Sequence, residues 1–423
     1  MRTKMLSVKK LISLMLCVVM CISLIPAQNY IDSVVAADEG TDTIDWTHPS
    51  ILYVGDMKIA TEGYWLNDGN GSLTTEGADE TNYNVYYDGT GTLYLNSLNV
   101  TTAYNASGIY VSCRSNFQIN VTGENTVDIS SLSDTYKYGL YSPKGDLYIT
   151  GTGSLTCIAS DDELVSTSSH RGVYTNNLHV EGAKLKGSVG ATSGSQDGYG
   201  VYVTSLTMQD GNLEGICSTT YYGYGIYITG NMDCINSVIT GTSEGRYRSY
   251  GLYTTGAINC EKSQIYATTK KTSSRNYGFY SAPTSASDIS IKNSELHASA
   301  GATTSTSGPT YTYGIYLTSN GALKVDNSSV YATGGAYNTS CTSAYSTGVA
   351  GGTELVGGTI IAKGMKKSFG TAPTLPTTDY WWRESNTGSY LKNNFKTPVS
   401  TYCEITTETQ EQVADAYIVF DAN

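Results

Sequence analysis

The sequence is poor in charged residues, which make up only 15% of its 423 positions, and those present are mostly acidic, giving a formal net charge of −12. Globular proteins average about 25% charged residues, so few ion pairs are available to stabilise the fold. An acidic surface repels nucleic acid and anionic lipid. The composition therefore excludes a nucleic-acid partner.

Long apolar runs are absent beyond the first residues. Basic residues precede an apolar run over residues 11–26, and small residues follow it up to Ala37. This order predicts a secretory signal peptide over residues 1–37, with a short linker over 38–49. A membrane anchor is disfavoured because the run is shorter than the ~20 apolar residues of a spanning helix. We expect a secreted protein, either released or retained at the cell surface, with no membrane span after signal cleavage.

The sequence also lacks a cysteine framework. Two of its nine cysteines fall within the expected signal peptide, and the remaining seven form no Cys-x-x-Cys pair. An odd number without such a pair disfavours both a disulfide scaffold and a zinc site. No metal and no cofactor are expected.

Proline and helical periodicity are scarce, whereas glycine (45) and tyrosine (36) are abundant. A glycine, an apolar residue and a tyrosine recur at intervals of 25 to 36 residues, and each copy is followed by two more short alternating runs. Three short strands per unit predict an all-β fold, a single-stranded right-handed parallel β-helix of about nine or ten coils. The copies lie at residues 107–110, 138–141, 171–174, 199–202, 224–227, 250–253, 277–280 and 313–316, with a weaker copy at 347–350.

Strand alternation predicts which side chains form the core. The apolar residue after each glycine should point inward, as at Ile226 and Leu252. The third strand of each unit pairs a large residue with a small one, which indicates that two walls approach closely there. Cys234 and Cys260 fall at the same position of adjacent coils. They are expected to be neighbouring thiols, with a disulfide as the less favoured alternative.

The two ends of the repeat differ from its middle. Exposed strand edges promote aggregation, so the terminal segments of a solenoid must cover them. We assign residues 50–364 to the β-helix with its N-terminal cap. Residues 365–423, which include YWWRES and TYCEITTE, form the predicted C-terminal cap and tail.

The order LYVG, GYW, NVYYDGTGTLYLNSLNV, GENTV, repeated YGIY strands and YWWRES resembles β-helix modules of secreted and cell-surface proteins in Gram-positive gut-type bacteria. The resemblance covers residues 50–408. Those modules are often labelled carbohydrate-binding because their pectate-lyase-like solenoid is related to polysaccharide-active β-helices. The resemblance implies a β-helix fold and a glycan or polysaccharide partner.

If the residue after each glycine points inward, the tyrosine after it points outward. A tyrosine ring offers an apolar surface and a hydroxyl, which suits a sugar. Two alternatives remain open: the tyrosines only stabilise pairing between coils, or the glycine reverses the alternation and turns them into the core. The candidate carbohydrate-binding tyrosines are Tyr110, Tyr141, Tyr174, Tyr202, Tyr227, Tyr253, Tyr280 and Tyr316.

The loops before these strands carry the one basic cluster of an acidic protein. Arg246, Arg248 and Arg275, with the neighbouring Lys270 and Lys271, are candidates for holding a uronic or sulfated sugar. Ordinary solvated loop charge is the alternative.

No catalytic constellation is visible. Glycoside hydrolysis needs two carboxylates about 5 to 9.5 Å apart, and Asp161 and Asp162 are the only adjacent aspartates. With Glu163 they are also the candidates for a calcium site, although a solvated turn is the simpler interpretation. None of the four histidines lies in a GHG-like setting.

We therefore predict a secreted, monomeric, non-catalytic protein that binds carbohydrate at the cell exterior, with a role in adhesion or polysaccharide capture. The first alternative is a structural or protein-interacting surface rod. A polysaccharide lyase or hydrolase is a further alternative.

Overall fold

The computed structural model describes residues 46–408, except 134–135, 161–168, 191–195, 220, 273, 284–286, 307, 342 and 396–399. These residues belong to one compact unit that starts at Trp46. All regular elements within them are strands, so they contain no helix long and apolar enough to cross a membrane. The expected signal peptide lies outside the described residues.

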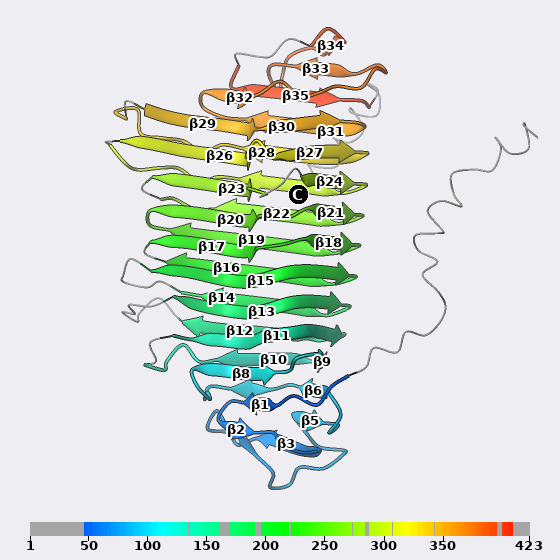
Figure 1. Ribbon diagram of the computed structural model, residues 1–423. Helices are drawn as coiled ribbons and strands as arrows, with labels where there is room; N and C mark the ends of the chain where they lie inside the picture. Colours follow the sequence, from blue (N-terminus) through cyan, green and yellow to red (C-terminus); the bar gives the residue numbers. More distant parts are fainter. Residues whose placement is uncertain are drawn as a thin grey trace, which may run out of the picture. The chain divides into compact units, whose positions relative to one another are not determined.

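The chain winds as the predicted right-handed parallel β-helix, with three walls per coil (Figure 1). The first wall contains β8 (Ser107–Ser112), β11 (Tyr138–Gly151), β13 (His170–Glu181), β15 (Asp197–Gln209), β17 (Tyr222–Ile228), β20 (Arg248–Thr254), β23 (Arg275–Ser281), β26 (Pro309–Leu317), β29 (Ser343–Ala350) and β32 (Lys367–Phe369).

The second wall continues from the first. In β11, β13 and β15 one long strand runs through both walls. In other coils the second wall has its own strand: β6 (Thr92–Asn96), β9 (Asn116–Thr122), β18 (Met232–Ile235), β21 (Ile258–Glu261), β24 (Ser287–Lys292), β27 (Gly321–Asp326) and β30 (Gly352–Leu355).

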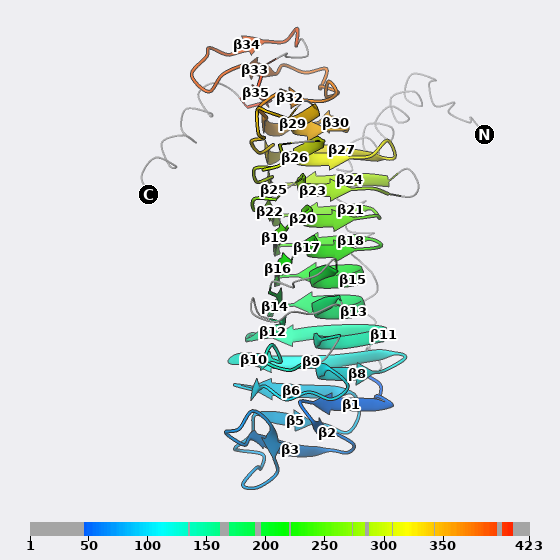
Figure 2. The same ribbon diagram turned by 90° about the vertical axis from the view of Figure 1, so that its left-hand side faces the viewer.

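The third wall is a separate sheet of 13 strands, whereas the first two walls share one sheet of 22 strands (Figure 2). Its strands are β7 (Asn99–Val100), β10 (Glu124–Asp128), β12 (Ser154–Ser160), β14 (Lys184–Val189), β16 (Asn212–Thr219), β19 (Val238–Gly245), β22 (Gln264–Thr269), β25 (Glu295–Ser299), β28 (Ser328–Thr333), β31 (Gly358–Lys363), β33 (Trp381–Arg383), β34 (Leu391–Lys392) and β35 (Tyr402–Thr406).

Equivalent residues of successive coils pair in parallel, as Leu140 does with Ile109 and Val173. First-wall strands pair in parallel from β8 to β29, with about eight full turns, and the short β32 continues the ladder. This is slightly fewer than the nine or ten expected. The difference arises because the terminal strands leave the winding and pair antiparallel.

The core consists of the predicted inward columns. The residue after each repeat glycine is fully buried, as are the inward-facing aliphatic residues of the second and third walls, such as Ile258 and Ile265. The first and third walls touch at the glycine: a Cβ added at Gly278 would lie 2.6 Å from the backbone nitrogen of Ser299. Cys234 and Cys260 face each other from paired positions of β18 and β21 as free thiols.

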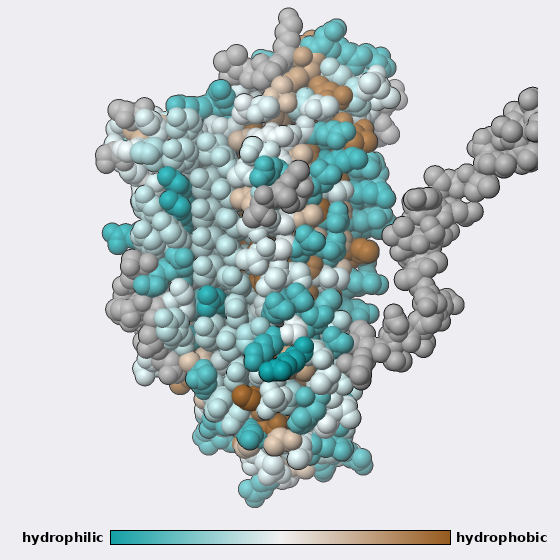
Figure 3. Space-filling view, in the orientation of Figure 1, coloured by the Kyte–Doolittle hydropathy of each residue, from teal (hydrophilic) through white to brown (hydrophobic). Residues whose placement is uncertain are grey.

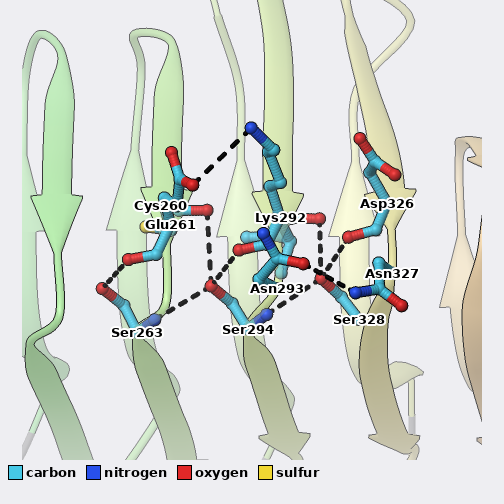
Figure 4. A network of polar contacts seen from close by, with 10 residues as sticks. Cys260, Glu261, Ser263, Lys292, Asn293, Ser294, Asp326, Asn327 and Ser328 are labelled. Carbon is cyan, nitrogen blue, oxygen red and sulfur yellow. Dashed lines mark hydrogen bonds and ion pairs between the residues drawn. The ribbon is translucent and has the colours of Figure 1, made fainter. Parts of the chain in front are cut away.

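The corner between the second and third walls repeats a buried serine (Figure 4). The backbone N–H of Ser263 donates to Oγ of Ser294 at 2.9 Å, and that of Ser294 donates to Oγ of Ser328 at 3.0 Å. The residue before each serine has a positive φ, for example 49° at Asn293 and 46° at Asn327. This left-handed conformation turns the chain sharply, and asparagine tolerates it better than most residues.

Both ends of the winding are covered. At the N-terminal end β1 (Ile51–Val54) pairs antiparallel with β8, next to β2 (Met57–Lys58), β3 (Gly63–Asn67), β4 (Leu73–Thr74) and β5 (Val85–Tyr87). At the other end β35 pairs antiparallel with β31. There Arg383 forms a buried ion pair with Glu404, with an N–O distance of 2.7 Å. The caps thus satisfy the strand edges that the repeat leaves open.

Candidate functional site

The first wall bends at each repeat glycine, and this bend decides which side chains face outward. Strict alternation would send Tyr250 and Leu252 of β20 to the same side. Leu252 lies in the solenoid core, whereas Tyr250 belongs to a separate tyrosine cluster. Alternation is therefore reversed at Gly251. Both Tyr250 and Tyr253 face outward, on either side of the bend.

The tyrosines after the glycines form a continuous outer ladder. Ring centroids of successive members lie 4.7 to 5.4 Å apart. All are half-buried and none enters the core, so the alternative that the glycine turns them inward is wrong. The outer ladder comprises all eight predicted residues: Tyr110, Tyr141, Tyr174, Tyr202, Tyr227, Tyr253, Tyr280 and Tyr316.

The tyrosines before the glycines form a second, inner ladder that the sequence argument missed. Its successive rings lie 4.8 to 5.6 Å apart, with planes within 11° of parallel. The two ladders pack edge to face: the rings of Tyr250 and Tyr253 are 5.4 Å apart at 89°. The recurring Tyr-Gly-x-Tyr motif was the feature of the sequence that could have revealed this ladder. The inner ladder comprises Tyr199, Tyr224, Tyr250, Tyr277 and Tyr313.

Stacking covers the ring faces of the outer ladder. The Tyr253 ring lies within 12° of the Tyr227 plane and within 9° of the Tyr280 plane, one neighbour on each side. The edges and hydroxyls of the rings remain for contact, and none of these three hydroxyls hydrogen-bonds another described residue. A sugar would therefore meet hydroxyls and ring edges here. In Figure 3 the surface over this wall, in the left-hand part, is mostly pale.

Burial raises the pKa of several ladder tyrosines above their ordinary value. Desolvation is the largest cause that raises the pKa of both Tyr250 and Tyr313 to about 12. It also raises the pKa of Tyr227 and Tyr253, where neighbouring tyrosines add to the effect. A neutral tyrosine hydroxyl can both donate and accept hydrogen bonds.

A third outward column, the edge column, flanks the inner ladder. It contains Arg248 and Arg275, which pair directly between β20 and β23. Each guanidinium also lies over a tyrosine ring, at 4.8 Å from Tyr222 and 4.9 Å from Tyr311 respectively. The column consists of Asp197, Tyr222, Arg248, Arg275, Tyr311 and Tyr345.

The remaining predicted arginine, Arg246, is exposed in the turn before β20 and lies outside all three columns. Sequence reasoning also missed Arg171, which takes a tyrosine position in the inner-ladder register between Tyr138 and Tyr199. Its guanidinium lies 4.9 to 5.6 Å from four tyrosine rings.

Within the described part of the chain, no three His, Cys, Asp or Glu side chains come together as metal ligands would. The candidate calcium residues Asp161, Asp162 and Glu163 lie outside the described residues. His297 stacks between two tyrosines of the third wall, at 5.0 Å from Tyr266 and 4.5 Å from Tyr331. His297 is therefore a partly exposed surface residue on the outer side of the third wall.

Comparison with known proteins adds no family: no family model matches the chain, and no curated protein or solved structure matches it significantly.

Proposed function

We propose that this protein is a secreted, non-catalytic β-helix that binds a polysaccharide or glycan along its first wall. The proposal depends on one observation: tyrosine hydroxyls follow one another from coil to coil along the outer ladder, without hydrogen-bond partners among the described residues. Successive hydroxyls repeat at the coil spacing, about 4.8 Å. A repeating ligand can use such a repeating surface.

The chemistry of the hydroxyls supports a sugar partner. Tyrosine hydroxyls are neutral near neutral pH, so they can form hydrogen bonds of both senses with sugar hydroxyls. The stacked rings are also rigid, so little conformational entropy is lost when a ligand binds them. Many weak contacts along a line then add up for a polymer.

The test separates hydroxyl chemistry from stacking. Tyr227→Phe combined with Tyr253→Phe removes two hydroxyls and keeps the ladder. Binding should fall about tenfold in a polysaccharide pull-down, because two hydrogen bonds are lost. The matched control is Tyr266→Phe on the third wall, which should bind as wild type does.

The second candidate function is a structural or protein-interacting rod, and the stacking geometry favours it. Ladder rings cover each other's faces, and such contacts stabilise neighbouring strands without any ligand. If the chain retains no member of a broad panel of neutral and acidic glycans, the carbohydrate proposal fails. The rod then remains, and Tyr227→Ala with Tyr253→Ala should lower stability.

A further inference from the structure

Neighbouring coils usually match opposite charges on the outer surface. Lys186 pairs with Glu214 at 3.1 Å across β14 and β16, and Lys292 pairs with Glu261 at 3.6 Å across β24 and β21. The edge column breaks this rule, because Arg248 stands directly opposite Arg275. Like charges at directly opposed positions destabilise a sheet.

The two arginines are not neutralised by the described residues. Neither forms an ion pair with a described carboxylate. Asp197, the one acidic member of the column, stands two coils from Arg248. The Nε atoms of Arg248 and Arg275 are both buried without a hydrogen-bond partner among the described residues. Buried donors without partners are unusual in proteins.

The surrounding rings hold the guanidiniums in place. Arg248 lies over Tyr222 at 4.8 Å, while Arg275 lies over Tyr311 at 4.9 Å. Side chains that are already ordered lose less entropy when a ligand binds them. Guanidinium groups also match the planar geometry of carboxylates and bind sulfate well.

An exposed aromatic residue adjoins this pair, because the Arg248 guanidinium also lies over the Tyr247 ring, 5.7 Å from its centroid. Tyr247 stacks on Tyr221 at 5.6 Å. In the next coil the position equivalent to Tyr247 is occupied by Ser274, as the backbone hydrogen bonds to the two carbonyls show. The aromatic stack therefore ends at Tyr247. Tyr247 is 38% exposed. Its exposed part can contact the apolar surface of a sugar beside the two arginines.

We propose that the glycan bound by the first wall is anionic, and that its carboxylate or sulfate groups bind across Arg248 and Arg275 beside the Tyr247 ring. This inference rests on the proposed carbohydrate-binding function and names its ligand class. Because the whole protein carries a net charge of −12, it repels polyanions in general. Affinity for one therefore has to come from a local site.

The test compares matched polymers. Binding of the purified chain is measured with polygalacturonate, with its methyl-esterified form, with dextran sulfate and with dextran. We expect an acidic polymer to bind about tenfold tighter than its neutral counterpart. The polygalacturonate and dextran sulfate arms show whether the anion is a carboxylate or a sulfate, and either preference supports the proposal.

Two double variants carry the same change in net charge. Arg248→Gln with Arg275→Gln should lower affinity for the acidic polymer about tenfold and leave the neutral polymer unchanged. Arg246→Gln with Lys271→Gln, at exposed residues outside the column, should change affinity less than about twofold. If the first variant has a lowered melting temperature, Arg248→Lys with Arg275→Lys provides a second test. It keeps both charges and should still weaken binding, because lysine lacks the planar, bidentate geometry of a guanidinium.

Two results would overturn the inference in different ways. Equal binding of acidic and neutral polymers, unaffected by Arg248→Gln with Arg275→Gln, would remove the anionic ligand and leave glycan binding standing. Failure to bind any polymer or panel glycan would remove both proposals together.

Discussion

The first and third walls belong to the same coils, yet their outward surfaces follow different rules. On the third wall, neighbouring coils match Lys186 with Glu214, and a short aromatic stack around His297 interrupts the mixed surface. On the first wall, two tyrosine ladders run side by side, and Arg248 opposes Arg275.

The difference shows that the β-helix does not require particular residues on its outer surface. Both walls bury their inward columns completely, and the third wall does so with varied outward residues. Two aromatic ladders are therefore not a condition of the β-helix. They are a property of one wall, and the variants below test what they contribute.

The largest effect is expected where the two walls touch. Gly278→Val places side-chain atoms against the Ser299 backbone, where even a Cβ would lie only 2.6 Å from the nitrogen. We expect the free energy of unfolding to fall by about 3 kcal/mol or more, because backbone cannot move aside cheaply. Denaturant titration measures this. Gly352→Ala is the control: the nearest atom to its Cβ would lie 3.5 Å away, and a similar loss there would contradict the close-approach argument.

The second prediction compares one tyrosine from each wall. Tyr250 is 6% exposed and stacks on both sides, so Tyr250→Ala should cost about 3 kcal/mol. Tyr266 on the third wall is half-buried and stacks on His297 alone. Tyr266→Ala should cost about 1 kcal/mol or less. Thermal and denaturant unfolding measure both losses. If they are equal, the inner ladder contributes no more to the free energy of unfolding than the stack on the third wall.

The third prediction concerns pH. The folded-state pKa of Tyr250 is raised to about 12, above its ordinary value of 10.0, mainly by burial. The folded protein therefore binds this proton more tightly than the unfolded chain, and the associated stability is present below pH 10. It is lost as the pH rises from 10 through 12, at roughly 2 kcal/mol per such group. Stability measured across this range should fall less steeply in Tyr250→Phe than in wild type. An unchanged slope in Tyr250→Phe would show that this hydroxyl does not contribute to the loss.

The smallest effect is expected at the matched charges of the third wall. Lys186 and Glu214 are both partly exposed, and pairs of this kind contribute about 0.5 kcal/mol or less. Lys186→Gln should lower stability by that amount at low salt and by nothing measurable in 1 M salt. A loss above 1 kcal/mol, insensitive to salt, would mean that charge matching holds the third wall together.

Much of the fold was predictable because each winding rule is local. The glycine spacing gave the coils, and the apolar residue after each glycine, such as Leu252, was correctly placed in the core. The same alternation placed Tyr253 outside. The merging of the first two walls into one sheet was not predictable, because it depends on hydrogen bonding around a bend.

The inner ladder and the edge column were harder to predict. Strict alternation assigns Tyr250 to the side of Leu252, and only the reversal at Gly251 brings it out. Arg246 and Arg248 are two residues apart and look equivalent in sequence. They separate because β20 begins at Arg248, which fixes its pairing with Arg275. Glycan binding, secretion and the absence of catalysis remain predictions.

The serine corner has a consequence for how the chain assembles. The backbone donor of Ser263 is satisfied only by Ser294 of the following coil, and that of Ser294 only by Ser328 of the next. Each completed coil therefore has one backbone N–H whose acceptor lies in the following coil. These hydrogen bonds all point from one coil toward the next one in the sequence. A chain emerging N-terminus first can add coils in that direction as they appear, each new turn completing the last, until the C-terminal cap ends the series.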